Sequence, residues 1–399
     1  MNSAELRATF GLGAVYALRM LGVFMVLPIF EIYARNLPQH PGQYAIQFAM
    51  TATAMMQALL QIALGRLSDR IGRKPVIAMG MLVFAFGSYV AGLSDRIEVI
   101  TLGRALQGAG AISSAVTALL ADVTREQVRT IAMAIMGAGM GVSFVAALIL
   151  GPVAVGFFGV SGIFHLTAVL ALLALPVIWL AAPGKESPKP GSSLNLRAIF
   201  SDLDLLRLSG GILLLHACII CIFTGAPLLI QADFGLPVQE HWKVYLPVLV
   251  GTLFLALPLM RRADRGAERT LLTGGVATLV VGLLVAGLIH SSTGLIAGLS
   301  IFFLAFNLLE GLLPSLISRR APAEHKGAAL GVYATAQFLG QPVGGFLGGW
   351  TLAHTNNAAT VLAVAAVLPL LWLTFAHRLR PSLNAQAEHQ EAAHGTWHQ

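Results

Sequence analysis

The sequence contains few charged residues and almost no cysteine. Charged residues make up 11% of its 399 residues, whereas soluble proteins carry roughly 25%. Apolar residues account for 56% of the chain. So few charges cannot cover a water-facing surface with polar groups. The composition therefore excludes an ordinary soluble enzyme and an intrinsically disordered chain, and it favours a protein embedded in a lipid bilayer.

The two cysteines, Cys218 and Cys221, lie within one apolar run, which excludes a disulfide framework. Together with His216 they could form a metal or redox site, but small apolar packing residues are the favoured interpretation. The sequence also lacks a Walker motif, a Gly-x-Ser-x-Gly motif and a His-Glu-x-x-His motif. These absences argue against an ATP-driven pump and an intramembrane enzyme. We therefore expect no cofactor and no metal site.

Twelve apolar segments predict the fold. A helix needs about 20 apolar residues to span the hydrocarbon core of a bilayer. The sequence predicts an all-α membrane protein with twelve transmembrane helices in two six-helix halves. The segments are Ala8–Tyr33, Ala45–Leu67, Pro75–Leu93, Val99–Ala121, Thr130–Val160, Ile163–Ala181, Leu208–Gln231, Val244–Leu259, Leu271–His290, Leu295–Ile317, Ala328–Trp350 and Ala358–Ala376.

The distribution of Lys and Arg predicts the orientation. If the N-terminus is cytoplasmic, 20 of the 25 basic residues lie in cytoplasmic gaps or tails, and only Arg35, Arg96 and Lys243 lie on the other side. Basic residues accumulate on the cytoplasmic side of membrane proteins. We therefore expect both termini in the cytoplasm and the chain in a bacterial inner membrane. The positive charge lies between apolar runs rather than on one soluble face, so we expect no nucleic-acid partner.

A Pro- and Ser-containing gap divides the chain. The sequence predicts a first bundle over residues 1–182, a cytoplasmic linker over 183–207, a second bundle over 208–376 and a polar cytoplasmic tail over 377–399. A degenerate repeat supports two related halves, because residues 65–74 and 261–269 both contain Asp-Arg followed by Gly and Arg. Two similar six-helix halves around a central path are typical of secondary transporters.

The most specific motif follows the second segment. It reads Gly65-x3-Asp69-Arg70-x-Gly72-Arg73-Lys74. Basic residues are common at this place, but the spaced glycines and the Asp are not explained by topology alone. Arg73 can pair with a carboxylate from another helix, and Asp122 at the end of the fourth segment is the candidate. Breaking a partly buried pair of this kind costs about 3–5 kcal/mol.

This motif resembles the hallmark of the major facilitator superfamily, and the segment count, repeat and orientation agree with that resemblance over the whole chain. The resemblance implies that Asp69, Arg73 and Asp122 form a network that stabilises one access state. Residues 19–28, 240–246 and 306–318 further resemble drug:proton antiporters of the YajR type. Many such proteins carry an additional soluble C-terminal domain, which this chain is expected to lack.

Charged residues inside the apolar segments are costly and mark functional positions. Arg19 lies deep in the first segment and needs an interior partner. Arg104, with Gln107 nearby, resembles the superfamily pattern in which an Arg of the fourth helix is linked to proton coupling. Glu31 and Glu310 are the favoured proton carriers. Glu31 is expected at the depth of Arg104, and Glu310 is expected within reach of Arg19.

The remaining candidates concern the substrate and helix packing. Polar and aromatic residues that face a central path could contact substrate, although each could instead be structural. A partial match to the antiporter motif of the fifth helix predicts a kink and close packing. The substrate candidates are Phe24, Gln107, His216, Asn307 and Gln337, and the antiporter-motif candidates are Gly141, Gly151 and Pro152.

Together these patterns indicate a secondary active transporter. The favoured mechanism is proton-coupled antiport, by alternating access, of a lipophilic or amphipathic small molecule. The alternatives are an importer or facilitator of a metabolite with the same fold, and a non-transporting membrane receptor or scaffold. The expected partners are the small-molecule substrate, protons and lipid, and the chain is expected to be a monomer.

Overall fold

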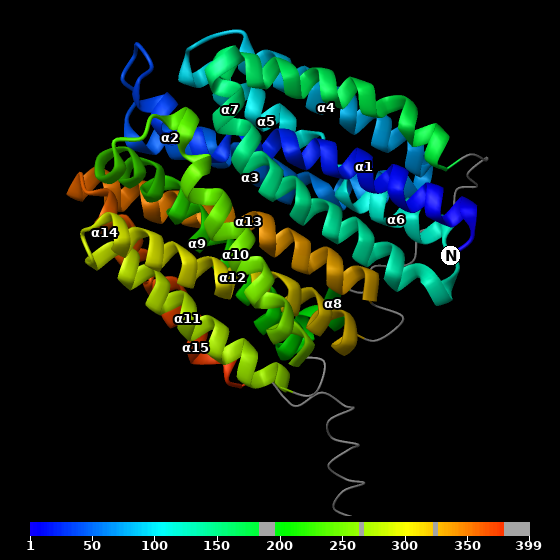
Figure 1. Ribbon diagram of the computed structural model, residues 1–399. Coiled ribbons are helices and arrows are strands. Elements are labelled where there is room, and N and C mark those ends of the chain that lie inside the picture. Colours follow the sequence, from blue (N-terminus) through cyan, green and yellow to red (C-terminus); the bar gives the residue numbers. More distant parts are fainter. Residues whose placement is uncertain (183–195, 263–266, 322–325, 379–399) are drawn as a thin grey trace, which may run out of the picture.

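The computed structural model describes residues 1–182, 196–262, 267–321 and 326–378, and it arranges them as an all-helical bundle (Figure 1). Most of the expected linker and almost all of the expected tail lie outside the described residues. The first half contains α1 (Ser3–Met25), α2 (Leu27–Arg35), α3 (Gln43–Ile71), α4 (Arg73–Gly92), α5 (Ile97–Ala109), α6 (Ser113–Val123) and α7 (Glu126–Ala181).

The second half follows after a short helix, α8 (Leu196–Ser201). It occupies the lower part of Figure 1, in green to red, beneath the blue-to-green first half. Its elements are α9 (Leu203–Phe234), η1 (Val238–Glu240), α10 (Trp242–Arg262), α11 (Glu268–Leu288), α12 (Ser292–Arg320), α13 (Lys326–Thr355), α14 (Ala358–Ala365) and α15 (Val367–Ala376).

Several expected segments are each built from two helices. The first divides at Val26, just before Pro28, because proline has no amide hydrogen to donate to the helix. The fourth divides between Ala109 and Ser113, where a side chain on Gly110 would collide with the Gly80 carbonyl of α4. These interruptions sit within apolar runs, so hydropathy alone does not reveal them.

The longest helix, α7, covers the fifth and sixth expected segments. It has 56 residues, which corresponds to roughly 84 Å at 1.5 Å per residue, far more than the roughly 30 Å hydrocarbon core. Gly159 lies inside it with φ 64° and ψ 179°, a conformation outside the helical region. The continuous helix is therefore interrupted at Gly159.

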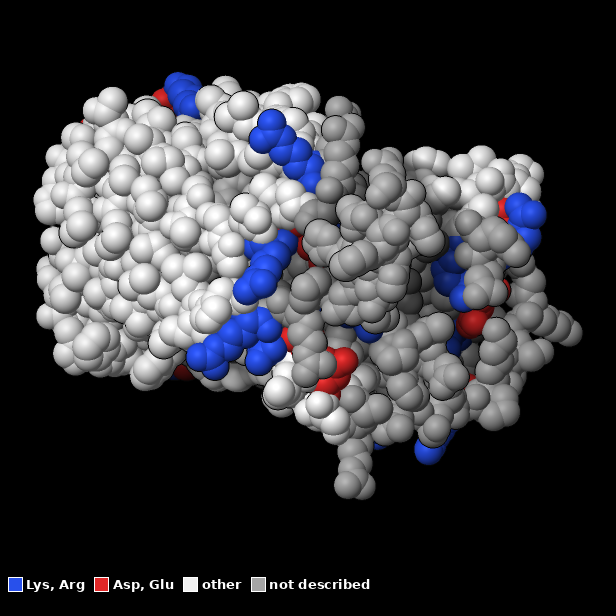
Figure 2. Space-filling model, turned by 90° about the horizontal axis from the view of Figure 1, so that it is seen from below, with Lys and Arg blue, Asp and Glu red and all other residues white. Residues whose placement is uncertain are grey.

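The surface of the bundle fits a bilayer. Ten helices or joined helices of the described part are long and apolar enough to cross a membrane. Large apolar side chains are exposed on the outside, including Phe157 at 78% and Phe254 at 67%. Figure 2 shows a broad area without charged side chains beside a region where Lys and Arg gather. Exposed apolar surface on this scale is costly in water and suits lipid, so the chain is a multi-pass membrane protein.

The two halves meet along α3 and α13. Glycines of α13 allow this approach, because a side-chain carbon on Gly349 would lie 2.6 Å from Cγ of Gln47 on α3. The same helix packs against α9 of its own half, where such an atom on Gly344 would lie 2.1 Å from the Ala217 carbonyl oxygen. α13 therefore lies against both α3 and α9, and its glycines fix the spacing at the interface between the halves.

Candidate functional site

The motif at residues 65–74 lies where α3 turns into α4. Gly72 separates the two helices with φ 102°, a backbone conformation that favours glycine. Arg73 begins α4 and pairs with Asp69 of α3, and its Nε lies 3.4 Å from Oδ2 of Asp122 on α6. Its Nη1 also donates to Ser68 Oγ at 2.7 Å. The arginine therefore connects three helices of the first half.

A second ion pair at this end was not anticipated from the sequence. Glu5 of α1 accepts from Nε and Nη2 of Arg125 at 2.8 and 3.1 Å, and its side chain is 4% exposed. It also accepts from the backbone amide of Asn2 at 2.7 Å. The carboxylate raises the pKa of Arg125 above its ordinary value by hydrogen bonding. The pair connects the start of α1 to the start of α7. The Asn2–Glu5 capping box marks the start of α1 in the sequence, but no local pattern indicates Arg125 as the partner of Glu5.

Arg19 is fully buried within the first half and has few partners. Its Nη2 donates to Gln57 Oε1 at 2.9 Å, and its guanidinium carbon lies 5.1 Å from the centre of the Phe84 ring. Gln57 in turn donates to Ser113 Oγ. Nε and Nη1 of Arg19 have no hydrogen-bond partner among the described residues. The structure thus holds a buried cation without the charged partner that the sequence analysis expected in Glu310.

Arg104 has a different environment. Its Nη2 and Nε donate to the Met50 and Ala49 carbonyl oxygens of α3 at 2.8 and 3.2 Å, and Nη1 lies 3.4 Å from Gln107 Oε1. The amide of Gln107 donates to Ser88 Oγ of α4. Arg104 is 1% exposed. Arg104 therefore connects α5 to α3 through hydrogen bonds to backbone carbonyl oxygens. The described contacts do not include one between Arg104 and Glu31.

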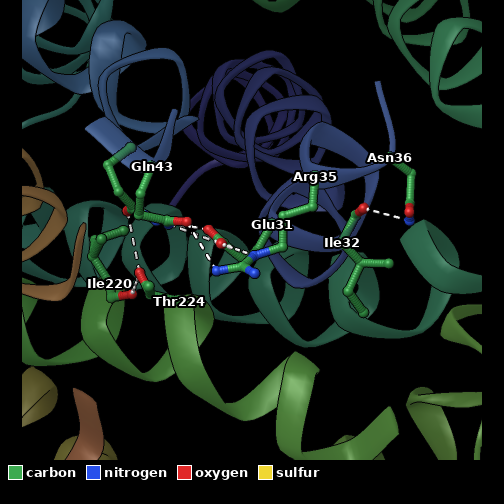
Figure 3. A network of polar contacts seen from close by, with 8 residues as sticks. Glu31, Ile32, Arg35, Asn36, Gln43, Ile220 and Thr224 are labelled. Carbon is green, nitrogen blue, oxygen red and sulfur yellow. Dashed lines mark hydrogen bonds and ion pairs between the residues drawn. The ribbon is translucent and has the colours of Figure 1, made fainter. Parts of the chain in front are cut away.

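Glu31 of α2 lies beside the start of α3, whereas the motif lies at the end of α3. A network of neutral donors and one arginine surrounds its carboxylate (Figure 3). Its Oε1 accepts from Arg35 Nε and Gln43 Nε2, each at 2.8 Å. Its Oε2 accepts from Gln47 Nε2 at 2.7 Å. Gln47 Oε1 then accepts from the hydroxyl of Thr224 on α9 at 3.1 Å. The network therefore runs from α2 through α3 into the second half.

Glu310 belongs to a polar cluster of the second half. Gln337 Nε2 lies 3.1 Å from Glu310 Oε1 and 2.9 Å from His216 Nε2, while His216 Nδ1 lies 3.9 Å from Glu310 Oε2. The side chains of Glu310 and His216 are 28% and 12% exposed. Three expected candidates from α9, α12 and α13 thus meet at one place. Asn307 does not join them, because its amide donates to Thr252 of α10.

Aromatic rings from both halves lie beside this cluster. Phe144 of α7 stacks with Phe306 of α12, their ring centres 6.3 Å apart, and meets Phe223 of α9 edge-on at 6.2 Å. Phe24 of α1 contacts Phe144 at 5.2 Å, and Phe306 lies 6.1 Å from the His216 ring. Phe144 was missed by the sequence analysis, because one Phe in a long apolar run gives no distinguishing signal.

The antiporter-motif candidates behave differently from one another. A side-chain carbon on Gly151 would lie 2.2 Å from the Met25 carbonyl oxygen, so this glycine is required where α7 packs against α1. Such an atom on Gly141 would meet nothing within 4 Å. Pro152 lies inside α7. Cys218 and Cys221 are buried free thiols, and Cys221 lies 3.3 Å from the Gly344 carbonyl, consistent with packing residues.

Comparisons with known proteins agree with this architecture. The chain is 42% identical to the inner membrane transport protein YajR of Escherichia coli (strain K12), over 95% of this chain and 85% of that protein. It is 31% identical to the multidrug transporter MdfA of Edwardsiella ictaluri (strain 93-146), over 89% of this chain and 92% of that one.

Among solved structures, the crystal structure of a bacterial homologue of the human lysosomal transporter Spinster, in an inward-facing and unoccupied conformation, matches with a TM-score of 0.74. It is 14% identical over 95% of this chain and 97% of that chain, a likeness that concerns the fold. Residues 12–345, and separately residues 242–398, match the family described as the Major Facilitator Superfamily. The chain therefore belongs to the major facilitator superfamily and is a membrane transporter rather than an enzyme.

Proposed function

We propose that this transporter is a proton-coupled antiporter that exports a lipophilic or amphipathic small molecule by alternating access. The observation that carries the proposal is the cluster of Glu310, His216 and Gln337 beside aromatic rings from both halves. A site that is lined by both halves changes its surroundings whenever the halves move relative to each other. That is the property required of a substrate site in alternating access.

The carboxylate of Glu310 supplies the coupling chemistry. Gln337 donates to Oε1, whereas Oε2 has no hydrogen-bond partner among the described residues. An ionised carboxylate in an apolar interior is costly unless a proton or another positive group accompanies it. A bound proton and a substrate with a positive or hydrogen-donating group therefore compete for the same oxygen. Competition of this kind exchanges one for the other, which is antiport.

The aromatic rings supply the substrate preference. Phe24 and Phe144 come from the first half, and Phe223 and Phe306 from the second. Ring faces bind apolar and planar groups without demanding one hydrogen-bond pattern. A lipophilic or amphipathic molecule suits such a surface better than a highly polar metabolite. The name of the MdfA relative, a multidrug transporter, agrees with this substrate class.

The proposal includes twelve membrane crossings. The ten spans include one of 51 residues, Ile131–Ala181, which is long enough for two crossings around Gly159. α13 is a further helix of 30 residues whose polar and glycine residues lower its hydropathy. Arg73, between Asp69 and Asp122, would act as the latch that stabilises one access state at the N-terminal end of the bundle.

Both termini are proposed to be cytoplasmic, because 20 of the 25 basic residues then lie on that side. The inner membrane is the proposed location, as in the name of the YajR relative. Reporter fusions after Arg380 test the orientation. We expect activity from a cytoplasmic reporter and none from a reporter that requires export. The reverse result would overturn the topology.

The function is tested in proteoliposomes with an imposed pH gradient and a panel of ethidium, rhodamine 6G and tetraphenylphosphonium. We expect a gradient to drive uptake of at least one of these compounds against its concentration. Glu310→Gln should abolish gradient-driven uptake. Substrate counterflow should persist, because it moves no net proton, but with a weaker apparent affinity, because the charged oxygen is missing. The matched control is Glu240→Gln, which removes a carboxylate that is 41% exposed and paired with Lys243 outside the cluster.

Two results would contradict the proposal. Normal gradient-driven uptake by Glu310→Gln would exclude Glu310 from coupling. Flux of a polar metabolite down its own gradient, with no response to a pH gradient and no uptake of the panel compounds, would identify a facilitator of the same fold instead.

A further inference from the structure

Gln47 contacts both halves of the molecule through one amide group. Its Nε2 donates to Glu31 Oε2 of the first half at 2.7 Å, and its Oε1 accepts from Thr224 of the second half at 3.1 Å. Gln47 is 2% exposed and Thr224 is buried. α13 closes over the pair, because side-chain carbons on Gly348 and Gly349 would lie 3.2 Å from Thr224 Oγ1 and 2.6 Å from Gln47 Cγ. This contact therefore lies at a closed interface.

The charge on Glu31 determines which way the Gln47 amide points. An ionised carboxylate can only accept hydrogen bonds. Its neighbour must therefore present an N–H group, and the amide nitrogen of Gln47 faces Glu31. The amide oxygen then necessarily faces Thr224.

In that orientation, the contact between the halves has two acceptors but only one donated hydrogen. The hydroxyl of Thr224 has a single proton and two acceptors within reach, the Ile220 carbonyl oxygen at 2.9 Å and Gln47 Oε1 at 3.1 Å. Gln47 offers no proton on this side while its nitrogen faces Glu31. A bond from Thr224 to one acceptor thus weakens the bond to the other.

Loss of the negative charge on Glu31 resolves this shortage. Arg35 and Gln43 both donate to Oε1, so a proton would reside on Oε2 and point at Gln47. The amide of Gln47 would then turn over, accept from Glu31 and donate its N–H to Thr224 Oγ1. Thr224 would then donate its proton to the Ile220 carbonyl oxygen alone, and the bond between Gln47 and Thr224 would no longer compete for that proton.

We propose that Glu31, Gln47 and Thr224 form a gate between the halves at the outer end of the bundle, and that removing the charge of Glu31 strengthens its closed form. The assignment to the outer end rests on the proposed function and topology. Arg35 is the charged group that contacts Glu31, whereas α3 presents Gln43 and Gln47, and α9 presents Thr224, none of which titrates near neutral pH. Glu31 is thus a positioning residue that acts through Gln47.

The gate is tested by the distance between spin labels on purified protein without substrate or pH gradient. Labels on Pro38→Cys and Lys243→Cys report the separation of the halves at this end, since both residues are exposed and the native thiols are buried. Glu31→Gln carries an amide N–H where the proton would be. We expect it to raise the ratio of closed to open protein about five-fold, the effect of one additional hydrogen bond.

Four further variants identify the mechanism. Thr224→Val should abolish the effect of Glu31→Gln, because the bond that gains strength is then missing. Thr335→Val is the matched control: Thr335 of α13 accepts from Gln61 of α3 at 2.9 Å, also across the interface between the halves, but without a carboxylate in the chain of bonds. The effect of Glu31→Gln should persist there. Gln47→Glu should open the gate by placing two carboxylates together, and the reciprocal variant Glu31→Gln/Gln47→Glu should restore the wild-type ratio.

An unchanged or more open distribution in Glu31→Gln would overturn the gate, as would an effect that survives Thr224→Val. If Glu31→Gln does not fold, failure of the reciprocal variant to reverse the effect of Gln47→Glu would overturn it equally. None of these measurements uses substrate or a gradient. Failure of the gate is therefore distinguishable from failure of proton-coupled transport, which is tested at Glu310.

Discussion

The two buried arginines of the first half should respond in different ways to the same substitution. Arg19→Met and Arg104→Met each remove a cation that is at most 1% exposed and lies over a phenylalanine ring. The desolvation cost that each substitution relieves, several kcal/mol, is therefore similar. What differs is the number of hydrogen bonds that are lost with the guanidinium.

Arg19 makes one hydrogen bond, to Gln57 at 2.9 Å, and two of its nitrogens have no partner in the described part of the chain. Arg104 makes bonds of 2.8 and 3.2 Å to backbone oxygens and a longer one of 3.4 Å to Gln107. A hydrogen bond that involves a charged group contributes about 1.5–3 kcal/mol. Counting one extra bond in full and the long 3.4 Å bond only in part, Arg104→Met should be about 2–4 kcal/mol less stable than Arg19→Met.

Arg19→Met itself should be neutral or stabilising, because replacing a poorly paired buried ion with an apolar residue often gains about 1–4 kcal/mol. The orphaned Gln57 oxygen offsets about 1–3 kcal/mol of that gain. For a chain of 399 residues, 1 kcal/mol corresponds to about 1 °C, so the melting temperatures of the two variants should differ by about 2–5 °C. Thermal unfolding of detergent-purified protein, followed by intrinsic fluorescence, measures the difference.

Transport completes the test. If Arg19 is retained for coupling rather than for stability, Arg19→Met should keep a high melting temperature and lose gradient-driven transport. Equal melting temperatures in the two variants would refute the hydrogen-bond argument. A stable Arg19→Met variant with normal transport would refute the functional role of Arg19.

Two ion pairs at the end opposite Glu31 give further predictions. Asp122→Asn should lower the free energy of unfolding by only about 1 kcal/mol or less, because the Arg73 and Asp122 side chains are 17% and 31% exposed. It should nevertheless reduce transport strongly, and Glu98→Gln, in a pair more than 60% exposed, should not. Normal transport by Asp122→Asn would argue against the latch. Glu268→Gln should cost about 1–3 kcal/mol, measured by thermal unfolding, because Glu268 is 8% exposed and contacts both Arg319 and Arg320. An unchanged melting temperature would show that the contacts of Glu268 do not contribute to stability.

Hydropathy predicted most helices within a few residues, because a bilayer demands a fixed length of apolar chain. It did not predict the divisions at Val26 and between Ala109 and Ser113, which depend on proline chemistry and on the approach of α4. The cost of about 3–5 kcal/mol expected for breaking the Arg73–Asp122 pair is larger than the value of about 1 kcal/mol or less that the 17% and 31% exposure of its side chains supports. Exposure depends on how helix ends are arranged, and a linear pattern contains no such information.

Partner choice was the least predictable feature. Arg19 was expected to reach Glu310, but its bond goes to Gln57, and Glu310 contacts Gln337 and His216. A charged residue in an apolar segment is easily recognised in the sequence. Its partners here are mostly neutral amide side chains, which a sequence pattern does not distinguish from other polar residues. Which side chains meet depends on the rotation of each helix about its axis. A rotation error of 100° moves the exposed position by a single residue, which is below the resolution of a hydropathy pattern.

The internal repeat shows the same limit at the level of the two halves. The repeat aligned residues 65–74 with 261–269, and the Asp-Arg of the second copy falls on residues outside the described part of the chain. The structure shows a corresponding ion pair in each half that the aligned sequences do not show. In the first half, Arg73 at the start of α4 pairs with Asp122 at the end of α6. In the second, Glu268 at the start of α11 pairs with Arg320 at the end of α12. The two ion pairs connect corresponding helices, but the positive and negative residues have exchanged places. A sequence comparison that scores identical residues cannot detect such a pair. The attraction between opposite charges is nevertheless unchanged by the exchange.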